Sequence, residues 1–404
     1  MIPFSNKIIS KNFLYLNYIL YLIPFSMIIG NFAINFVSII SCILLVSIIL
    51  SDKPHLRFNI KELTIILSAV LLLFINLIYS ENLIFSVKKL FGLFKYLILS
   101  IAIFYCCTHS EKFYLTFLKI IFFTVLFVST DSIIQFFLNY DIFGFKPKLF
   151  LDTNNEIIFK RLTGPFGDEL VPGSFIAKFG FLSLILLSIK KKEKLIYIFL
   201  FYFIFVVFLT GERSAFIMIC FTSLIFIILD NRSYMIKILL ISTLIMFFTF
   251  TFQNNRNILN HYQNFNLTKS SETISIINNF QDTQWGAHYL TAIEIFKENI
   301  FFGSGLGSFR FKCSDKSYDN INSKLKYARC SSHPHNIYLE ILSETGIFIF
   351  FLFIFLNLKI FYSLFKEIFF KKNELGLLLF CNYIVLFNPF QTTGSFFSTW
   401  TGIF

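Results

Sequence analysis

Long apolar runs, separated by short polar segments, form the dominant pattern of this chain. Most runs are about 17–25 residues long, the length that a helix needs to cross the hydrocarbon core of a bilayer. The pattern predicts spans at 14–29, 33–50, 63–79, 85–106, 113–138, 170–189, 195–211, 214–229, 235–251, 336–358 and 375–390, and a short apolar tail at 394–404. We therefore predict an all-α polytopic membrane protein with about 11–12 transmembrane helices.

The composition supports this interpretation. Hydrophobic residues make up 56% of the chain and charged residues only 14%, whereas an ordinary soluble domain has about 25% charged residues. The formal net charge is +12, which in a soluble protein would point to a nucleic-acid partner. Here the Lys and Arg residues lie in short loops between predicted spans, where they set the orientation in the membrane. We therefore expect no nucleic-acid partner.

Clusters of basic residues orient the predicted spans. They follow the second, sixth, eighth and tenth spans and consist of Lys53, His55, Arg57 and Lys61; Lys190, Lys191, Lys192 and Lys194; Arg232 and Lys237; and Lys359, Lys366, Lys371 and Lys372. All four loops fall on one side, which the positive-inside rule identifies as cytoplasmic. The N-terminus is then cytoplasmic as well, and 139–169, 211–213 and 252–335 lie outside.

The segment 252–335 is too long for a simple connection between spans. Within it, apolar residues recur at helical spacing over 283–299, namely Trp285, Tyr289, Ile293 and Phe296. We predict a short amphipathic helix against the membrane face. The glycine-rich run 303–307 ends this helix. Because no strand precedes the run, we predict a turn there rather than a nucleotide-binding loop.

Four regions are expected from these boundaries. Residues 1–138 form the N-terminal transmembrane helices, and 139–251 form the central helices with their outer loop 139–169. Residues 252–335 form the large outer loop, and 336–404 form the C-terminal transmembrane helices.

Two of the seven cysteines, Cys313 and Cys330, lie 17 positions apart in the large outer loop. The others fall in spans or at their cytoplasmic ends, where cysteine packs as a small apolar residue. An oxidising compartment outside the membrane allows Cys313 and Cys330 to form a disulfide. Such a bond would stabilise the loop by about 3 kcal/mol in the chain-entropy model. The alternative is a pair of free thiols.

The segment that joins the outer loop to the tenth span carries candidate chemistry. His335 is expected at the outer mouth of the span, with His333 two positions earlier, and histidine is the side chain best suited to exchange a proton near neutral pH. Asn336, Glu340 and Glu344 follow at i, i+4 and i+8 as a polar stripe on one helical face. Such a stripe usually faces the bundle interior or a wet cavity. The alternative is an interfacial histidine that only hydrogen-bonds the loop.

Two further outer segments carry guanidinium groups. Glu212 and Arg213 lie between two spans with almost no loop, where a charge pair is costly unless it has a role. Arginine presents its donors in a fixed fork suited to phosphate oxygens, and the alternative is a structural Glu–Arg pair. Arg161 precedes a Gly/Pro turn at 164–167 and is either a second anion ligand or a solvated loop charge.

Taken together, a proton acceptor and two guanidinium groups are expected on one outer face. This set fits glycan transfer from a lipid-linked pyrophosphate donor. The arginines would stabilise the charge that develops on the leaving group, and a general base would deprotonate the attacking hydroxyl. No acidic or histidine cluster with clear metal-ligand spacing occurs on that side of the sequence, so the reaction requires no metal.

The ordered motifs resemble the superfamily of O-antigen ligases and O-antigen polymerases. Ligases of this family carry His, then Asn, Ser or Gln, nine further residues and then Gly, and here His335 and Asn336 are followed after nine residues by Gly346. Ile349 departs from the Gly, Thr or Val that ligases often have three positions later. The 303–309 segment and the segments around Arg161 and Arg213 also look like family blocks in the right order, so the resemblance covers roughly 150–404.

The resemblance implies a GT-C-like fold with about twelve spans and a large periplasmic loop in the bacterial inner membrane. It implies action on undecaprenyl-pyrophosphate-linked glycan without a metal, nucleotide or other cofactor. His335 would match the essential histidine, while Arg213 and Arg161 would match pyrophosphate-binding arginines. Glu212, His333, Asn336, Glu340 and Glu344 would support them.

The resemblance leaves the acceptor open. A ligase transfers the glycan to lipid A–core oligosaccharide, a polymerase transfers it to a second lipid-linked glycan, and related members glycosylate proteins. Other classes also remain. A transporter or flippase of lipid-linked glycan would favour repeats and interrupted helices near the midplane, and a scaffold would have little use for Arg213 or His335. The tail 394–404 is too short to cross the membrane alone, so it is either truncated or re-entrant.

Overall fold

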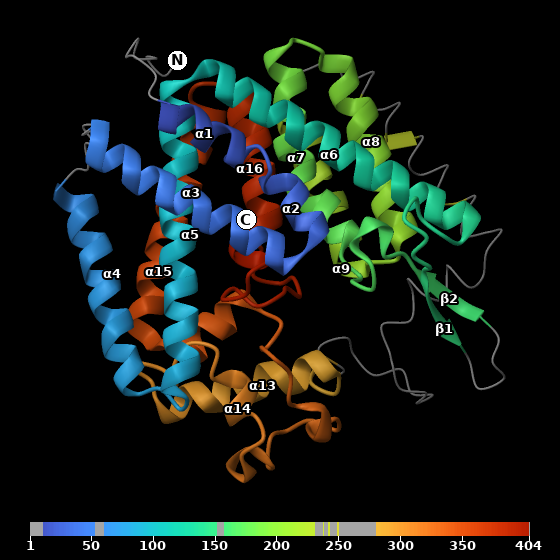
Figure 1. Cartoon of the computed structure of the whole chain (residues 1–404). Coiled ribbons are helices and arrows are strands. Elements are labelled where there is room, and N and C mark those ends of the chain that lie inside the picture. The colour runs from blue at the N-terminus through green and yellow to red at the C-terminus, as the bar shows by residue number, and fades with distance from the viewer. Residues whose placement is uncertain are drawn as a thin grey trace.

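The computed structural model describes residues 11–52, 60–151, 157–230 and 280–403, together with single positions between 231 and 279. The apolar helices are α1 (Lys11–Leu20), α2 (Ile23–Ile29), α3 (Asn31–Asp52), α4 (Ile60–Ile78), α5 (Leu83–His109), α6 (Glu111–Leu138), α7 (Pro172–Ile189), α8 (Glu193–Thr210), α9 (Arg213–Leu229), α15 (Ile337–Phe369) and α16 (Glu374–Phe387). Figure 1 shows that they form one bundle.

Six of the described helices are long and apolar enough to span a membrane, and the pair α1 and α2, bent by 42°, qualifies as a further, broken span. Residues 64–78, α9 and α16 are shorter apolar helices. Each predicted span within the described residues coincides with one of these helices, whereas the predicted span 235–251 lies outside them. The prediction of an all-α polytopic membrane protein is confirmed.

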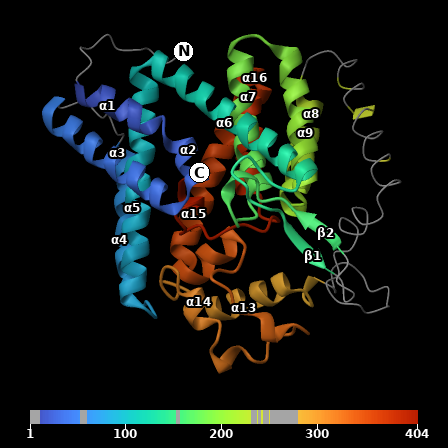
Figure 2. The same cartoon turned by 45° about the vertical axis from the view of Figure 1, so that its right-hand side comes forward.

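Helix α7 lies at the centre of the second half of the bundle. It packs against α6, α8, α9 and α16, and Figure 2 shows these helices gathered around it. Phe175, Phe181 and Leu184 of α7 are almost fully buried in the largest apolar cluster. A helix that is apolar on all faces is expected in such an interior position.

The first half of the bundle is thinner. Helices α1, α2 and α3 pack together, and α3 and α1 also pack on α5, with their own apolar cluster around Leu16, Leu20 and Ala102. Helix α4 lies against α5 and α15. Many large apolar side chains on these helices are exposed, among them Phe32, Ile78 and Phe91. In a chain with several predicted spans, such surfaces fit contact with lipid.

Small elements cover one end of the bundle. Strands β1 (Lys148–Leu151) and β2 (Ile157–Arg161) form an antiparallel hairpin with Lys148 opposite Arg161, which the sequence did not predict, and a short 3₁₀ turn, η1 (Gly164–Phe166), follows it. The outer loop carries α13 (Gln284–Glu298), α14 (Phe309–Lys312), η2 (Lys316–Tyr318) and η3 (Lys326–Ala328). In Figure 1 α13 and α14 lie below the bundle.

Helix α13 occupies the range predicted for an amphipathic helix, and Thr283 caps its start by accepting a hydrogen bond from the Gly286 N–H. A second face of the helix packs on the rest of the protein. His288, Thr291 and Ile295 are fully buried, because α13 packs against α15 and η3. The face defined by Trp285, Tyr289, Ile293 and Phe296 is only half-buried.

The chain after α16 folds back into the bundle, and we refer to 388–403 as the C-terminal segment. Apart from the short 3₁₀ turn η4 (Thr401–Ile403), it contains no helix, and the C label in Figure 1 lies amid the helices. The Tyr96 hydroxyl donates to the Thr399 carbonyl at 3.0 Å, and the Lys178 ammonium lies 5.1 Å from the Trp400 ring centre. The C-terminal segment therefore packs against α5 and α7 without forming a helix of spanning length.

Candidate functional site

The start of α15 is fixed by its N-cap residue. The Asn336 side-chain oxygen accepts hydrogen bonds from the Tyr338 and Leu339 N–H groups, and its amide nitrogen donates to the Pro389 carbonyl at 2.8 Å. An Asn in this position satisfies helix N–H groups that have no partner within the helix. Asn336 therefore orients the chain that enters α15 and ties it to the C-terminal segment.

His335 directly precedes this cap and is held at several atoms. Its backbone lies in the left-handed region with φ of 59°, which is uncommon for a residue other than glycine and marks a constrained position. Its carbonyl accepts a hydrogen bond from the Thr393 N–H at 2.8 Å, and its Nε2 lies 3.1 Å from the Ser331 hydroxyl. The imidazole thus has a fixed place at the outer end of α15.

Three histidine rings gather at this point. The ring centres of His333 and His288 lie 4.2 Å and 5.3 Å from that of His335. Burial, together with the neighbouring His333 and His288, lowers the pKa of His335 to about 4. Burial also lowers the pKa of His333, whose Nε2 lies 3.0 Å from the Thr393 carbonyl. At neutral pH His335 is therefore uncharged and able to accept a proton.

His288 was not recognised from the sequence. It comes from α13, 47 positions before His335, and no spacing rule connects the two. Its Nδ1 lies 2.9 Å from the Arg329 carbonyl, and its Nε2 has no hydrogen-bond partner among the described residues. The only available signal was a histidine on the predicted amphipathic helix, and that signal is weak.

The carboxylates of the predicted polar stripe are buried and hold loops in place. Glu340 accepts hydrogen bonds from the Ser395 hydroxyl and, at 2.7 Å, from the Phe396 N–H. Glu344 accepts from the Gly307 N–H at 2.6 Å and the Phe309 N–H at 3.1 Å. The stripe therefore faces the bundle interior, where Glu340 fixes the C-terminal segment and Glu344 the glycine-rich turn.

The backbone of α15 closely approaches the backbone of segment 301–303. Gly346 lies at φ of 77° and interrupts the helical backbone of α15. A Cβ atom at Gly346 would lie 2.3 Å from the Phe301 carbonyl oxygen, and one at Gly303 would lie 2.4 Å from the Glu344 backbone. Asn76 links the two segments, because its side-chain amide donates hydrogen bonds to the carbonyl of Phe302 and, at 2.8 Å, to the carbonyl of Glu344. The motif glycine is thus required for packing.

Glu212 and Arg213 lie at the outer turn between α8 and α9. Both Glu212 carboxylate oxygens accept hydrogen bonds from the first turn of α7, from the Gly173 N–H at 2.6 Å and the Ser174 N–H at 3.1 Å, and the Ser174 hydroxyl donates at 2.6 Å. A carboxylate at a helix N-terminus is stabilised by the unpaired N–H groups there. Glu212 therefore fixes the position from which Arg213 starts α9.

Arg161 lies beside this turn at the end of β2. The Leu162 N–H donates to the Thr210 carbonyl at 3.1 Å, and Arg161 interacts electrostatically with Glu212. The Arg161 Nε is buried and has no hydrogen-bond partner among the described residues. The structure thus brings Arg161 next to the Glu212–Arg213 turn, although the two segments are about 50 positions apart in the sequence.

A buried glutamine, not recognised from the sequence, fixes the turn after Arg161. The Gln135 side-chain oxygen accepts from the Thr163 and Gly164 N–H groups at 2.9 Å each, and its nitrogen donates to the Thr163 hydroxyl at 2.9 Å. All of its partners are at good hydrogen-bonding distance. A buried side chain of this kind specifies one loop conformation.

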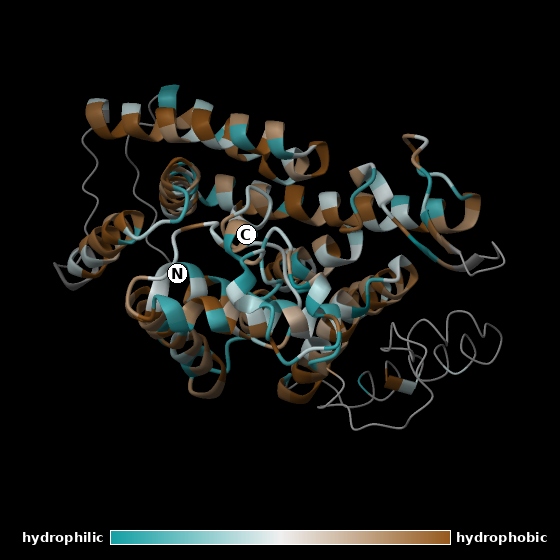
Figure 3. Cartoon of the chain, turned by 90° about the horizontal axis from the view of Figure 1, so that it is seen from below, coloured by the Kyte–Doolittle hydropathy of each residue, from teal (hydrophilic) through white to brown (hydrophobic). Residues whose placement is uncertain are grey.

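The C-terminal segment connects two groups of residues. We call them the histidine group (His288, His333 and His335) and the arginine turn (Glu212 and Arg213). The Ser214 hydroxyl, next to Arg213, lies 3.5 Å from the Thr392 carbonyl. The next residue, Thr393, contacts His335 and His333 through its backbone. Viewed from this end in Figure 3, hydrophilic residues lie mainly in the loops near the middle and hydrophobic ones along the surrounding helices. The predicted site residues therefore lie around one polar area at one end of the bundle.

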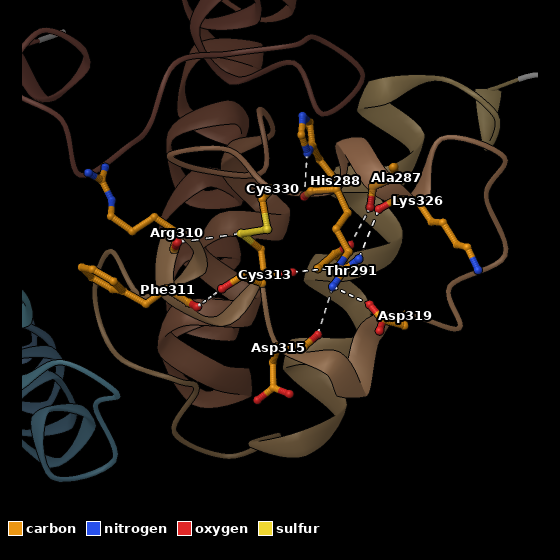
Figure 4. The surroundings of a disulfide bond; sticks show 12 residues. Ala287, His288, Thr291, Arg310, Phe311, Cys313, Asp315, Asp319, Lys326 and Cys330 are labelled. Carbon is orange, nitrogen blue, oxygen red and sulfur yellow. Dashed lines mark hydrogen bonds and ion pairs between the residues drawn. A yellow bond between two sulfur atoms is a disulfide. The ribbon is translucent and has the colours of Figure 1, made fainter.

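The outer loop is closed by a disulfide between Cys313 and Cys330, whose Cα atoms are 5.1 Å apart. Figure 4 shows it beside α13. The Arg329 side chain donates hydrogen bonds to the carbonyls of Cys313 and Asp315 and forms an ion pair with Asp319. Cys330 immediately precedes Ser331, which contacts His335. The disulfide therefore anchors the segment that leads into the histidine group.

These features describe an all-α polytopic membrane protein whose candidate site residues gather at one end of the helix bundle. Residues 198–354 match the family model described as O-antigen ligase. The match includes Arg213 and His335 but not Arg161. It confirms the predicted resemblance to the O-antigen ligase superfamily, and that family implies a glycosyltransferase-like enzyme in general terms. A search among curated proteins found no match to this chain.

Proposed function

We propose that this protein transfers a glycan from undecaprenyl pyrophosphate to a hydroxyl group of lipid A–core, as an O-antigen ligase does. The observation that carries this proposal is His335, an uncharged and buried imidazole joined through Thr392 and Thr393 to the turn that carries Arg213. The family match supports lipid-linked glycans as the class of substrate. We place the reaction at the periplasmic face of the bacterial inner membrane, with the N-terminus in the cytoplasm.

The reaction balances with residues of this chain alone. The acceptor hydroxyl attacks the anomeric carbon of the glycan, and a ring nitrogen of His335 takes the hydroxyl proton. The bond between that carbon and the pyrophosphate oxygen breaks, and its electron pair leaves on the pyrophosphate. The charge that develops there is stabilised by fixed cations placed before the reaction begins.

Arg213 and Arg161 are the proposed ligands of the leaving pyrophosphate. Arg213 is placed by the α8–α9 turn that Glu212 fixes, and Arg161 by the Gln135-bound loop. The Arg161 Nε has no partner among the described residues, so it can donate to a phosphate oxygen without breaking a described bond. Glu212 acts as a positioning residue in this proposal because its carboxylate is occupied by the start of α7.

The remaining predicted residues support His335 in different ways. His333 lowers the pKa of His335 and contacts Thr393, and Asn336 caps α15. Glu340 and Glu344 hold the two loops that border the site. Among the described residues no group of three or more His, Cys, Asp or Glu side chains is arranged to hold a metal. The mechanism proposed here uses none.

The test is a glycan-attachment assay with point variants. We expect His335→Ala and Arg213→Ala each to lower transfer by about 10²–10⁴-fold while the protein is still produced, because one removes the base and the other a pyrophosphate ligand. His109→Ala, at the last residue of α5 and away from the proposed site, is the matched control and should retain transfer. Wild-type glycan ladders from both site variants would overturn the assignment.

A polymerase is the second candidate, because the matched family includes both types of reaction. In that case the acceptor is a second lipid-linked glycan, with the same chemistry at His335. A strain that lacks the protein distinguishes the two. Loss of all O-chain from lipopolysaccharide is expected for a ligase, whereas a single-repeat band would identify a polymerase.

A further inference from the structure

Two cations that the proposed mechanism does not use lie on one aromatic ring near the histidine group. Lys89 of α5 and Arg310 of α14 flank Phe85, with the Lys89 ammonium 5.3 Å and the Arg310 guanidinium carbon 4.8 Å from the ring centre. Gly307 makes room for this arrangement, because a Cβ there would lie 2.5 Å from Phe85 and 3.3 Å from Lys89. Two segments that are distant in the chain, Phe85 with Lys89 in α5 and Gly307 with Arg310 at α14, meet here and define a built site.

Neither cation has a carboxylate partner within ion-pair distance among the described residues. Lys89 donates to the Phe397 carbonyl at 2.9 Å and Arg310 to the Ser332 carbonyl at 3.3 Å. The Arg310 Nε is buried and has no hydrogen-bond partner in the described part of the chain. By contrast Lys312, in the same short helix, pairs with Glu298 at 2.7 Å.

The nearest buried carboxylates are already occupied. Glu340 and Glu344 interact electrostatically with Lys89, and Glu340 also with Arg310. Their oxygens, however, accept hydrogen bonds from the C-terminal segment and the glycine-rich turn. Holding two cations together without a contacting anion costs free energy. An anionic ligand on Phe85 would remove that cost.

The cation pair and the arginine turn lie at different points along the C-terminal segment. Ser214, beside Arg213, contacts Thr392. His335 and His333 contact Thr393. Lys89 contacts Phe397, four residues further on, and Arg310 reaches the carbonyl of Ser332, next to His333. The histidine group therefore lies between two cationic areas.

We propose that Lys89 and Arg310 bind an anionic substituent, a phosphate or a carboxylate, on the acceptor glycolipid. This inference rests on the proposed function, because it takes the Arg213 side as the place of the donor pyrophosphate. The Arg310 fork and the Lys89 point charge together match a tetrahedral or planar oxyanion. An acceptor held there presents its neighbouring hydroxyl to His335, on the side opposite the leaving group.

The disulfide contributes to the position of Arg310. The Cys313 Sγ of the disulfide lies 3.8 Å from the Arg310 carbonyl oxygen, and Figure 4 shows the Arg310 side chain extending away from the disulfide. Arg310 thus lies in the short helix α14 that leads directly into the disulfide-closed loop, and Lys89 lies in the long helix α5. Rigid support of this kind favours specific recognition over loose attraction.

Equilibrium binding tests the proposal. Full-length protein in phosphatidylcholine nanodiscs is titrated with two acceptor glycolipids that differ only in one phosphate monoester. We expect the wild type to bind the phosphorylated form at least about tenfold more tightly. Arg310→Gln and Lys89→Gln should bind both forms with equal affinity, and Arg310→Lys should keep part of the preference because it retains the charge.

Lys312→Gln and Lys88→Gln are the matched controls, since they make the same change of charge in the same two helices. Both should keep the wild-type preference. The variants are compared by size-exclusion profile and by their affinity for the unphosphorylated acceptor, so that misfolding is distinguished from loss of an anion ligand. A wild-type preference in both Arg310→Gln and Lys89→Gln would overturn the proposal, as would a loss of donor affinity in place of acceptor affinity.

Two further outcomes separate the possible sources of failure. His335→Ala should bind the phosphorylated acceptor like the wild type although it does not transfer glycan. If His335→Ala transfers glycan normally, the proposed function fails. If His335→Ala does not prefer the phosphorylated acceptor over the unphosphorylated one, this inference fails. Loss of the wild-type preference in nanodiscs that contain phosphatidylglycerol would show that the site takes a lipid headgroup, and the acceptor assignment would be overturned.

Discussion

At the scale of single residues, the position of His335 decides what it can do. A histidine near an exposed loop has an ordinary pKa of 6.5 and is partly charged at neutral pH. Burial next to two other imidazoles holds His335 uncharged, while its backbone contact with Thr393 fixes its orientation. The first effect leaves the imidazole free to accept a proton, and the second holds it in one orientation.

The pKa of His335 predicts a pH dependence. Because its pKa in the folded protein is about 4, the base remains uncharged from neutral pH down to mildly acidic pH. The initial rate of transfer should therefore change little until the pH approaches about 4 and then fall as His335 takes up a proton.

The pKa of His335 also predicts how the free energy of unfolding depends on pH. The folded-state pKa lies below the ordinary value of 6.5, so the unfolded chain binds the proton more strongly. The contribution of His335 to the free energy of unfolding should thus be complete above about pH 6.5 and decline toward pH 4. Transfer rates and thermal melting are measured across this range, with recovery at pH 7 as the control. An acid limb of the rate centred near pH 6.5 would contradict the assignment.

At the scale of elements, backbone contacts fix α15 against the glycine-rich turn. Glu344 binds the N–H groups of this turn, and Gly346 and Gly303 let the two chains approach closely. Asn76 of α4 donates to both carbonyls at the contact. The glycine-rich turn at 303–307, which resembles a phosphate loop in sequence, therefore serves to pack α15 against the outer loop. It positions α14 and with it Arg310.

Gly346→Ala should destabilise the protein. The added Cβ would meet the Phe301 carbonyl oxygen at 2.3 Å, and φ of 77° disfavours any L-residue with a side chain. We expect a loss of at least about 1–3 kcal/mol of stability, measured as a lower melting temperature in detergent. Gly92→Ala in α5 is the matched control, since nothing lies within 4 Å of its Cβ. Equal melting of the two variants would show that the close approach is absent.

Reduction of the disulfide should lower stability and activity together. The bond closes a 17-residue separation, and its loss costs about 3 kcal/mol in the chain-entropy model. It also releases the segment Cys330–Ser331 that borders His335. Dithiothreitol should lower the melting temperature and the transfer rate of the wild type but leave a Cys313→Ser/Cys330→Ser variant unchanged. A wild type that does not respond to reductant, with both thiols free, would disprove the role of the bond.

At the scale of the whole molecule, the C-terminal segment joins the two halves of the site. It contacts α5 through Tyr96 and α7 through Lys178, and it receives hydrogen bonds from the outer ends of α9 and α15. No single helix contains the proposed chemistry. The site exists only when the outer loop, the α8–α9 turn and this segment lie together.

The orientation of the whole chain gives a separate prediction. The positive-inside rule places the loop after α7 in the cytoplasm and the loop that contains α13 and α14 outside. Alkaline phosphatase, which is active only outside the cytoplasm, should be active when fused after Asn320 and inactive when fused after Lys191. The opposite pattern would place the proposed site in the cytoplasm and exclude a periplasmic reaction.

The sequence by itself determined the helices and the candidate residues. Apolar runs of spanning length have few alternatives in a bilayer, because each backbone group must be satisfied within its own helix. Motif spacing likewise pointed to His335, and position next to predicted spans, with the order of the family segments, pointed to Arg213 and Arg161. The role of the polar stripe could not be predicted, since the partners of Glu340 and Glu344 are backbone N–H groups, which every residue carries.

Only the tertiary structure decided which distant residues meet. His288 reaches His335 from another helix, Asn76 binds a carbonyl 268 positions away, and Lys89 binds one 308 positions away. From the sequence, the C-terminal segment was too short to span a membrane. In the structure it contacts both the histidine group and the arginine turn. Such contacts leave no local pattern, because they depend on how whole helices pack and not on the order of residues along one of them.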